Sequence, residues 1–396
     1  MPTAAPNQYT FQKKTLPHGK EMIGYWHGNT QRASTMTPNQ IDYSKLSRIN
    51  YATFTTNENG KIYIRGKKNG SLNNEAEIVT LLGPYVWHPP NDGSSKEYCT
   101  ANPNNGNAGC MHHDYQQGML HLAHLSGVEV YPSITLDTNQ SLLQLDKEEF
   151  TKNAIQLLED YEFDGLDIHF EMSSLTGGQE DEAEAFQSLL SHLRREMIKL
   201  MYNQSKKYGI SVVMSCLPDV IQHQDIVQLD MLVDELNLLS FNLNTATSSD
   251  VSAPHAPLYT DPSESGDYHS VHACVNSWLI GGISQDKINV GLSFYGQTYK
   301  GTTEMYAEHD GVDTAHWTNN GDEDKDGSVP YYSIYPRLQE DRVDSLTTVR
   351  EDVTKTEYAF FEHNSDGGLV SYEDERSLCD KAEYGIANQL NGHFIW

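Results

Sequence analysis

The stretch FDGLDIHFE, residues 163–171, combines a strand-like alternation with three ionisable side chains near its end. Because successive side chains of a β-strand point to opposite faces, Asp167, His169 and Glu171 are predicted to share one face, with the apolar side chains between them on the other. Burying charged groups without partners is costly, so a purely structural role needs an ion-pair network among them. An inward carboxyl group beside another carboxylate has a raised proton affinity, as a general acid working near neutral pH requires. The alternation therefore predicts a catalytic site on this strand.

Seven further β-rich apolar runs surround this stretch, and segments of helical periodicity separate them. The runs are MIGYW (22–26), RINYATF (48–54), VEVYPSI (128–134), ISVVMS (210–215), ELNLLSF (235–241), INVGLSF (288–294) and GHFIW (392–396). In the helical segment 148–161 the apolar residues share one face: Phe150, Ala154, Leu157, Leu158 and Tyr161. Eight strands alternating with helices predict an α/β protein with a closed (β/α)8 TIM barrel.

The predicted strands end in residues that are unusually aromatic and polar. In a barrel of this kind the active face lies at the carboxyl ends of the strands, so these residues are expected to converge on one mouth. They are Tyr25, Trp26, Phe54, Ser133, Asp167, Glu171, Phe241, Asn242, Tyr295 and Trp396. Flat aromatic faces stack on sugars, which makes a carbohydrate a candidate ligand.

The domain organisation follows from one long connection. Residues 297–367 are too long for an ordinary link between strand and helix, and we expect them to form a small inserted α+β subdomain. The barrel domain is then predicted to comprise 22–296 and 368–396, after an N-terminal extension, 1–21. This extension lacks the charged-then-apolar pattern of an export signal, and no run of 18 or more apolar residues indicates a membrane span.

The net charge narrows the choice of partners. With 27 Lys and Arg against 55 Asp and Glu, the formal charge is −28. This charge repels phosphate backbones and anionic lipid surfaces, so we expect no nucleic acid and no membrane as partner. A neutral or cationic ligand is compatible with it.

Five cysteines are too few for a disulfide scaffold, and an odd number leaves at least one thiol free. Cys99 and Cys110 bracket the short loop CTANPNNGNAGC, for which a local disulfide and two free thiols are equally expected. Cys216, in VVMSC, is expected to be a small buried hydrophobic residue.

Two segments carry side chains of the types that bind metals. Asp322, Asp324 and Asp326 have the spacing of the first half of a calcium loop, but Pro330 and Ser333 occupy positions nine and twelve, so a solvated acidic turn is favoured over calcium. His113, His121 and His124 have near-helical spacing without an accompanying carboxylate or thiol set. An amphipathic helix with Met119, Leu122 and Leu125 inward is therefore favoured over zinc, and no metal site is predicted.

The run 163–171 resembles the signature D-G-x-D-x-D-x-E of glycoside hydrolase family 18, the chitinases and chitinase-like proteins. Other segments similar to family segments, in the same order, are NAIQLLEDYEFDGLDIHFE, APLYTDPSE, VNSWLIGGISQDKINVGLSFYG, VPYYSIY and GGLVSYEDERSLCDKAEYGIANQLNGHFIW. The resemblance covers roughly residues 22–396. It implies a retaining hydrolase of β-1,4-linked N-acetylglucosamine whose substrate acetamide is the nucleophile, with no cofactor.

The resemblance also implies roles for individual residues. Glu171 corresponds to the general acid, Asp167 to the inner aspartate of the signature, and Trp396 to the floor on which the sugar before the scissile bond stacks. Tyr25, Trp26 and Tyr295 match positions that line the cleft: these are expected sugar contacts. Chitin or chitooligosaccharides are the implied partners, and an extracellular location is expected because chitin is met outside the cell.

The sequence departs from the family pattern where the acetamide is held. His169 replaces the last Asp of the signature, and Phe241 replaces a tyrosine that donates to the acetamide carbonyl. Asn242 and Gln297 replace an acid and an arginine, and residues 135–136 replace a glycine pair. A neutral His169 can still accept a hydrogen bond, but Phe241 has no hydroxyl. At about 1–3 kcal/mol each, two or three lost hydrogen bonds are expected to slow the chemistry by roughly 10²–10⁵-fold.

Three functions remain compatible with these residues. The first is a hydrolase of weak or altered activity. The second is a non-catalytic chitin-binding lectin or a structural subunit of a larger protein complex. The third is action on another substrate, such as an N-glycan core.

Overall fold

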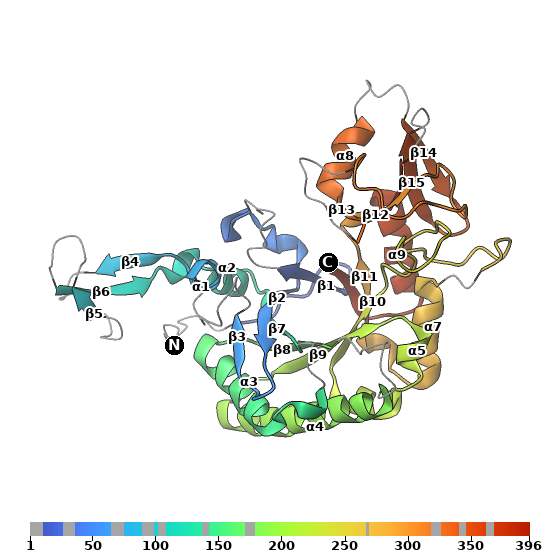
Figure 1. Ribbon diagram of the computed structural model, residues 1–396. Helices are drawn as coiled ribbons and strands as arrows, with labels where there is room; N and C mark the ends of the chain where they lie inside the picture. The colour runs from blue at the N-terminus through green and yellow to red at the C-terminus, as the bar shows by residue number, and fades with distance from the viewer. Residues whose placement is uncertain are drawn as a thin grey trace. The chain divides into compact units, whose positions relative to one another are not determined.

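The structure is a computed structural model that describes residues 11–26, 36–64, 75–88, 99–101, 108–136, 142–170, 179–266, 269–317, 326–339, 346–361 and 368–396. Eight parallel strands form a closed (β/α)8 barrel, which confirms the predicted fold class (Figure 1). Their order in the sheet follows the chain: β1 (Glu21–Trp26), β2 (Arg48–Thr56), β7 (Glu129–Thr135), β8 (Gly165–His169), β9 (Gly209–Ser215), β10 (Glu235–Leu239), β11 (Ile288–Leu292) and β17 (Gly392–Ile395). Each of the eight predicted runs overlaps one of these strands. A ninth strand, β3 (Ile62–Ile64), pairs antiparallel with β2.

The chain divides into two compact units. The first comprises Met1–Glu171, Glu184–Val212 and Leu232–Asp234, and the second comprises Met172–Ala183, Val213–Met231 and Glu235–Trp396. Short 3-10 helices connect several elements: η1 (Pro38–Gln40), η2 (Tyr43–Lys45), η3 (Tyr115–Gln117), η4 (Leu142–Gln144) and η5 (Gln285–Lys287).

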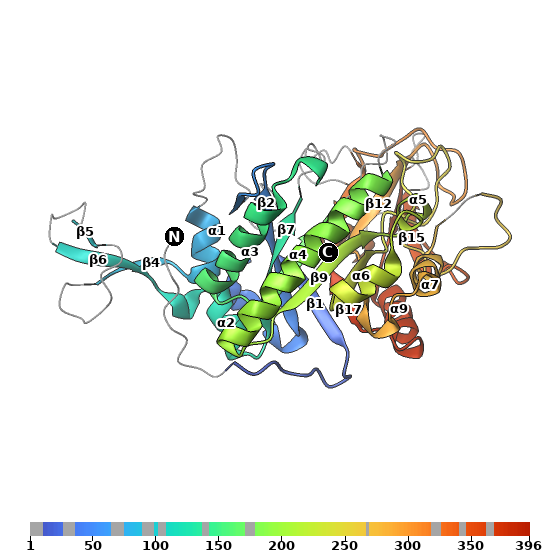
Figure 2. The same ribbon diagram turned by 90° about the horizontal axis from the view of Figure 1, so that it is seen from below.

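The helices of the first unit alternate with its strands along the chain. They are α1 (Glu75–Leu82), α2 (Met119–Leu125), α3 (Lys147–Tyr161) and most of α4 (Gln179–Gln204), and Figure 2 shows α3 and α4 side by side. The N-cap residue Asp146 begins α3 by accepting a hydrogen bond from the Glu149 backbone N–H at 2.9 Å. The five apolar residues predicted to share one face of this segment are all buried, which confirms that prediction.

Helix α2 differs from the prediction in its orientation. Met119 is buried, but Leu125 is 55% exposed. The reason is the buried carboxylate of Asp164, which requires partners: His124 Nε2 lies 2.8 Å from Asp164 Oδ2, and Lys206 Nζ lies 3.1 Å from Asp164 Oδ1. Turning His124 toward this carboxylate leaves Leu125 on the outer face. The expectation that Leu125 packs inward was wrong.

A small antiparallel sheet that the sequence did not predict extends from the first unit (Figure 1). Its strands follow the order β4 (Tyr85–His88), β6 (Ala108–His113) and β5 (Cys99–Ala101). Cys99 and Cys110 are directly opposite each other in the β5–β6 pair. Their side chains lie outside the described part of the structure, so the choice between a local disulfide and two free thiols remains open.

The second unit contains a disulfide that corrects the sequence analysis. Its helices are α5 (Pro218–Ile221), α6 (Ile226–Leu232), α7 (Val271–Gly281), α8 (Tyr331–Gln339) and α9 (Glu375–Ala387). Cys216, directly after β9, is bonded to Cys274 of α7, 58 residues further along the chain. Cys216 is buried as expected, but it is half of a disulfide and not a free thiol. Cys379 is free and exposed.

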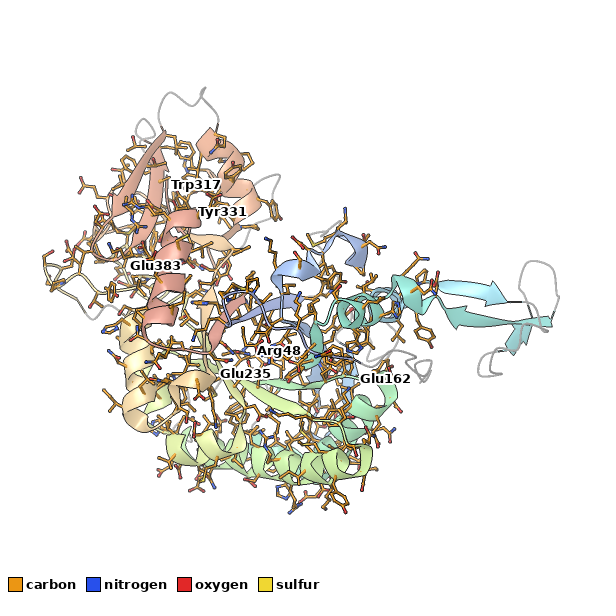
Figure 3. The ribbon with its side chains drawn as sticks, turned by 180° about the vertical axis from the view of Figure 1, so that it is seen from behind. Arg48, Glu162, Glu235, Trp317, Tyr331 and Glu383 are labelled. Atoms are coloured by element: carbon orange, nitrogen blue, oxygen red, sulfur yellow. A yellow bond between two sulfur atoms is a disulfide. The ribbon has the colours of Figure 1, made fainter. Side chains whose placement is uncertain are left out.

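A five-stranded antiparallel sheet takes strands from the segment predicted to be an insertion, 297–367, and from the residues directly before and after it. Its order is β13 (Ser328–Pro330), β12 (Tyr295–Lys300), β16 (Gly368–Tyr372), β15 (Thr356–Phe361) and β14 (Leu346–Glu351). Buried side chains form its core, with Trp317 marked in Figure 3: Trp317, Val329, Ile334, Ala359, Val370 and Tyr372. The boundaries proposed for the insertion remain a prediction.

Candidate functional site

Asp167 is the centre of a buried polar cluster in the first unit. The Tyr25 hydroxyl of β1 donates to Asp167 Oδ2 at 2.9 Å, and the Ser133 hydroxyl of β7 donates to the same oxygen at 2.7 Å. The Ser211 hydroxyl of β9 donates to Asp167 Oδ1. Burial raises the pKa of Asp167, and the three hydroxyl donors and the charge of Arg48 oppose that rise by favouring the carboxylate. The strand thus holds one carboxylate in a fixed orientation inside the barrel.

Arg48 is the buried cation that acts on this carboxylate. Its side chain is fully buried on β2, and its guanidinium lies 4.4 Å from the centroid of the Tyr131 ring (Figure 3). Its Nε donates to the Asn50 amide oxygen at 2.9 Å. The sequence analysis missed both Arg48 and Ser211. The available signal was a polar side chain within an otherwise apolar strand run.

His169 ends β8 on the same face as Asp167, as the alternation predicts. It is 6% exposed, and it is paired in register with Thr135 of β7. On the opposite face, Phe170 stacks on Phe186 of α4 with ring centroids 5.0 Å apart. Glu171, the expected general acid, lies outside the described residues.

Trp26 does not lie on the Asp167 side of the sheet. Tyr25 is in register with Asn50, and Trp26 is in register with Tyr51 on the alternate face. Two adjacent strand residues cannot both face inward, so of the pair Tyr25 and Trp26 only Tyr25 is brought to the buried cluster.

Phe54 was also expected at the mouth, and the structure places it elsewhere. A β-bulge lies between Tyr51 and Phe54, so Phe54 pairs in register with Ile134, which is paired with Ile168. Phe54 therefore shares the face of Ile168, opposite that of Asp167. It is 4% exposed, and its ring packs edge-on against Phe163 at 6.1 Å. The bulge adds one residue and so reverses the face that simple alternation predicts.

An aromatic cluster stands at the carboxyl ends of strands in the second unit. Phe241, which follows β10, lies 6.1 Å from Trp396 with the rings tilted by 33°, and 5.9 Å from Tyr295 in an edge-to-face arrangement. Phe241 is 6% exposed, whereas Tyr295 and Trp396 are half-buried. The cluster leaves part of two ring systems accessible and buries the third.

A neutral amide pair borders this aromatic cluster. Gln297 Nε2 donates to Asn242 Oδ1 at 2.9 Å and to Ser328 Oγ at 3.0 Å. Burial raises the pKa of Tyr295, and nearby acids including Glu373 add to that rise, so its hydroxyl stays protonated. Asn242 is thus in contact both with Gln297 and with the Tyr295 hydroxyl.

The described residues contain no group of three or more His, Cys, Asp or Glu side chains arranged to hold a metal ion. Asp322 and Asp324 lie outside the described residues, so the choice between a calcium loop and a solvated acidic turn remains open. Asp326 is described, and its carboxylate accepts a hydrogen bond from the Ser328 backbone N–H at 3.0 Å.

The fold and the site define a (β/α)8 barrel with a polar cluster around a buried aspartate, and comparison with known proteins identifies the family. The family model of glycosyl hydrolases family 18 matches residues 21–396. The chain therefore belongs to glycosyl hydrolases family 18.

Individual relatives agree with this assignment. Endochitinase 1 of Metarhizium robertsii is 24% identical over 252 residues, which cover 62% of this chain and 54% of the relative. The class V chitinase of Nicotiana tobaccum has a similar fold, with a TM-score of 0.71 and 19% identity over 95% of this chain and 93% of that one. A mutant of that enzyme solved in complex with NAG4 has a TM-score of 0.71 and 18% identity, again over 95% of this chain and 93% of that one. The chain spans 54%, 36% and 42% of the lengths of the first three curated relatives it matches, so it corresponds to only a part of each.

Proposed function

We propose that the protein binds β-1,4-linked N-acetylglucosamine polymers at the carboxyl ends of its barrel strands and hydrolyses them weakly, with retention and with the substrate acetamide as nucleophile. Membership of glycosyl hydrolases family 18 supports a glycosidase. The names of the relatives support chitin as the substrate class, and the tobacco chitinase bound to NAG4 supports a chitooligosaccharide ligand. Enzymes with this barrel bind their substrates at this end of the sheet.

The aromatic cluster carries this proposal. The half-buried rings of Tyr295 and Trp396 give apolar faces on which pyranose rings can stack, and the buried Phe241 ring packs against both. The exposed amide of Asn242, which accepts a hydrogen bond from the buried Gln297, offers an uncharged hydrogen-bonding group that suits a neutral sugar better than an ion. These residues can therefore bind an amino sugar even if its acetamide group is not aligned for reaction.

Weak hydrolysis follows from the same residues. In the proposed mechanism Glu171 protonates the leaving oxygen, and the carboxylate of Asp167 supports His169 from within the barrel. Phe241 has no hydroxyl to polarise the acetamide carbonyl, so the nucleophile is poorly aligned and poorly activated. At about 1–3 kcal/mol for each missing hydrogen bond, turnover is expected to fall by roughly 10²–10⁵-fold relative to a site with all of them.

A release assay on chitooligosaccharides tests this function. The wild-type protein is compared with Glu171→Gln, and Glu180→Gln is the matched control because Glu180 is an exposed acid at the start of α4. We expect Glu171→Gln to lower product release at least about tenfold, since a general acid typically contributes 10²–10⁴-fold, and we expect Glu180→Gln to leave it unchanged. Wild-type release equal to that of Glu171→Gln would refute hydrolysis.

A non-catalytic lectin or structural subunit is the second candidate. Phe241 favours it, because the substitution removes a catalytic hydroxyl while the half-buried rings of Tyr295 and Trp396 remain for stacking. Calorimetric binding of a chitooligosaccharide by wild-type protein that shows no release identifies this second function.

We also propose an extracellular location. The Cys216–Cys274 disulfide supports it, because such bonds form and persist in oxidising compartments. Among the described residues, no helix has the length and apolar character needed to cross a membrane.

A further inference from the structure

His255, in the connection between β10 and α7, lies beneath the aromatic cluster and has no role in the reaction described above. It is 1% exposed. Its imidazole stacks on the Tyr295 ring, with ring centroids 5.8 Å apart and an interplanar angle of 30°. Tyr295 therefore has a buried ring on one side, while part of its surface remains accessible.

A chain of hydrogen bonds fixes this imidazole. His255 Nε2 lies 3.3 Å from Ser293 Oγ, and Ser293 Oγ lies 2.9 Å from Glu373 Oε2. The same carboxylate oxygen accepts a hydrogen bond from the Ser293 backbone N–H at 3.0 Å, and the other oxygen is paired with the buried ammonium of Lys381. The four residues linked by these hydrogen bonds are all buried.

Which atom donates in each of these hydrogen bonds determines the tautomer of His255. The Ser293 hydroxyl has one proton, and the ionised Glu373 is the stronger acceptor for it. Ser293 Oγ must then accept from His255, which places the ring proton on Nε2 and leaves Nδ1 unprotonated. Burial lowers the pKa of His255 to about 3, and the charge of Lys381 acts in the same direction, so the ring is neutral near pH 7. Nδ1 is buried and has no hydrogen-bond partner among the residues that the structure describes, which agrees with its lacking a proton to donate.

The backbone of His255 is fixed as well. Its N–H donates to Ser371 Oγ of β16 at 3.1 Å, and its carbonyl accepts from the Leu243 N–H at 2.8 Å. Leu243 is two residues after Phe241, and Ser293 is two residues before Tyr295. His255 is therefore hydrogen-bonded to both segments that carry these two rings.

We propose that His255 is a positioning residue that fixes the Tyr295 ring as a stacking surface for N-acetylglucosamine. The inference rests on the proposed function, because it names how one sugar-binding ring of that site is oriented. The hydrogen bond to Ser293 orients the imidazole, and the stacked imidazole orients Tyr295. A ring that is already held in place loses no rotational freedom when the sugar binds, which strengthens binding.

Two substitutions of His255 test its ring and its N–H donor separately. His255→Gln keeps an N–H donor near the position of Nε2 but removes the ring, whereas His255→Phe keeps the ring but removes the donor. By calorimetry with an N-acetylglucosamine tetramer, we expect His255→Gln to weaken binding about tenfold and His255→Phe about threefold, in keeping with the modest energies of aromatic pairs and single hydrogen bonds. His272→Gln is the matched control, because His272 is a half-buried histidine on α7 that likewise contacts a tyrosine, Tyr384, at 3.1 Å. We expect this control to bind like wild type.

A double-mutant cycle distinguishes positioning from a general loss of structure. In a Tyr295→Ala background, His255→Gln is expected to have no further effect on binding, because the ring that it positions is gone. An equal loss in both backgrounds, or no loss in either, overturns the inference while the proposed function stands. Failure of the wild-type protein to bind the tetramer refutes the proposed function and, with it, this role. Nitrogen NMR of the histidine rings adds a readout without ligand: a neutral ring protonated at Nε2 between pH 5 and 8 supports the inference, and any other state overturns it.

Discussion

Replacing Tyr25 by Phe removes one of the hydroxyl groups that hold the buried Asp167 carboxylate, at 2.9 Å in the structure. The ring and its packing volume remain, so the change is confined to the hydrogen bonds of the hydroxyl, which are those with Asp167 and Asn50. Two other hydroxyl donors, on Ser133 and Ser211, keep Asp167 in place. The variant is therefore expected to fold, and its stability is expected to report on the charge of Asp167.

The magnitude follows from the charge on the acceptor. A hydrogen bond to a charged group contributes about 1.5–3 kcal/mol, against about 0.5–1.5 kcal/mol for a neutral acceptor. The entropy of unfolding is about 2.1 cal/mol/K per residue, or roughly 0.8 kcal/mol/K for 396 residues, so the larger loss lowers the melting temperature by about 2–4 °C.

The pH dependence carries a definite sign. The pKa of Asp167 is raised in the folded protein, so its ionisation costs stability as the pH rises through the folded pKa. Tyr25→Phe removes a group that favours the carboxylate and raises this pKa further. Below the folded pKa, Asp167 is protonated in the folded protein, and the variant is expected to lose only the smaller contribution of a hydrogen bond to a neutral acceptor. Above the folded pKa, Asp167 is ionised, and the variant loses the larger contribution of a hydrogen bond to a charged acceptor. The difference in stability between wild type and variant is therefore expected to widen as the pH rises.

Thermal unfolding of wild type and Tyr25→Phe between pH 4 and pH 8 measures this gap. Tyr43→Phe is the control, because the Tyr43 hydroxyl donates to a neutral acceptor, the Pro38 carbonyl, at 3.0 Å. We expect its deficit to be the same at every pH. A deficit of Tyr25→Phe that is constant across the pH range would refute the assignment of a buried carboxylate at Asp167.

Three further changes test other parts of the structure. The double variant Cys216→Ala with Cys274→Ala opens a loop of 58 residues, and differential scanning calorimetry is expected to show a loss of about 4 kcal/mol, or roughly 5 °C; an unchanged melting temperature would contradict the disulfide. Lys381→Met leaves the Glu373 carboxylate buried without its cation, so denaturant unfolding is expected to show a free energy of unfolding lower by about 3–5 kcal/mol. Adding Glu373→Gln is expected to recover part of this loss. A double variant that is no more stable than Lys381→Met would contradict the ion pair. Phe241→Tyr is expected to raise kcat/KM for chitooligosaccharide release by roughly 5–150-fold, the equivalent of about 1–3 kcal/mol, and no increase would contradict the role assigned to the missing hydroxyl.

The fold could be predicted from the sequence because the patterns that indicate it lie within short stretches of the chain. Each barrel strand is a short apolar run, and the two-residue alternation in 163–171 was enough to place Asp167 and His169 on one face. The packing face of α3 followed from helical spacing in the same way.

The remaining features depend on contacts between segments far apart in the chain. Which hydroxyls reach Asp167 is determined by the register of neighbouring strands, so Ser211 was missed. The bulge that turns Phe54 away from Asp167 exists only in the pairing of β2 with β7. The Cys216 disulfide spans 58 residues and has no local signal.

A crystal structure of the wild-type protein with an N-acetylglucosamine tetramer tests the central claim most directly. The account predicts a pyranose ring stacked on Trp396, next to the Phe241 and Tyr295 rings, with no side chain of position 241 donating to the acetamide carbonyl. A tetramer bound away from Trp396 would contradict it.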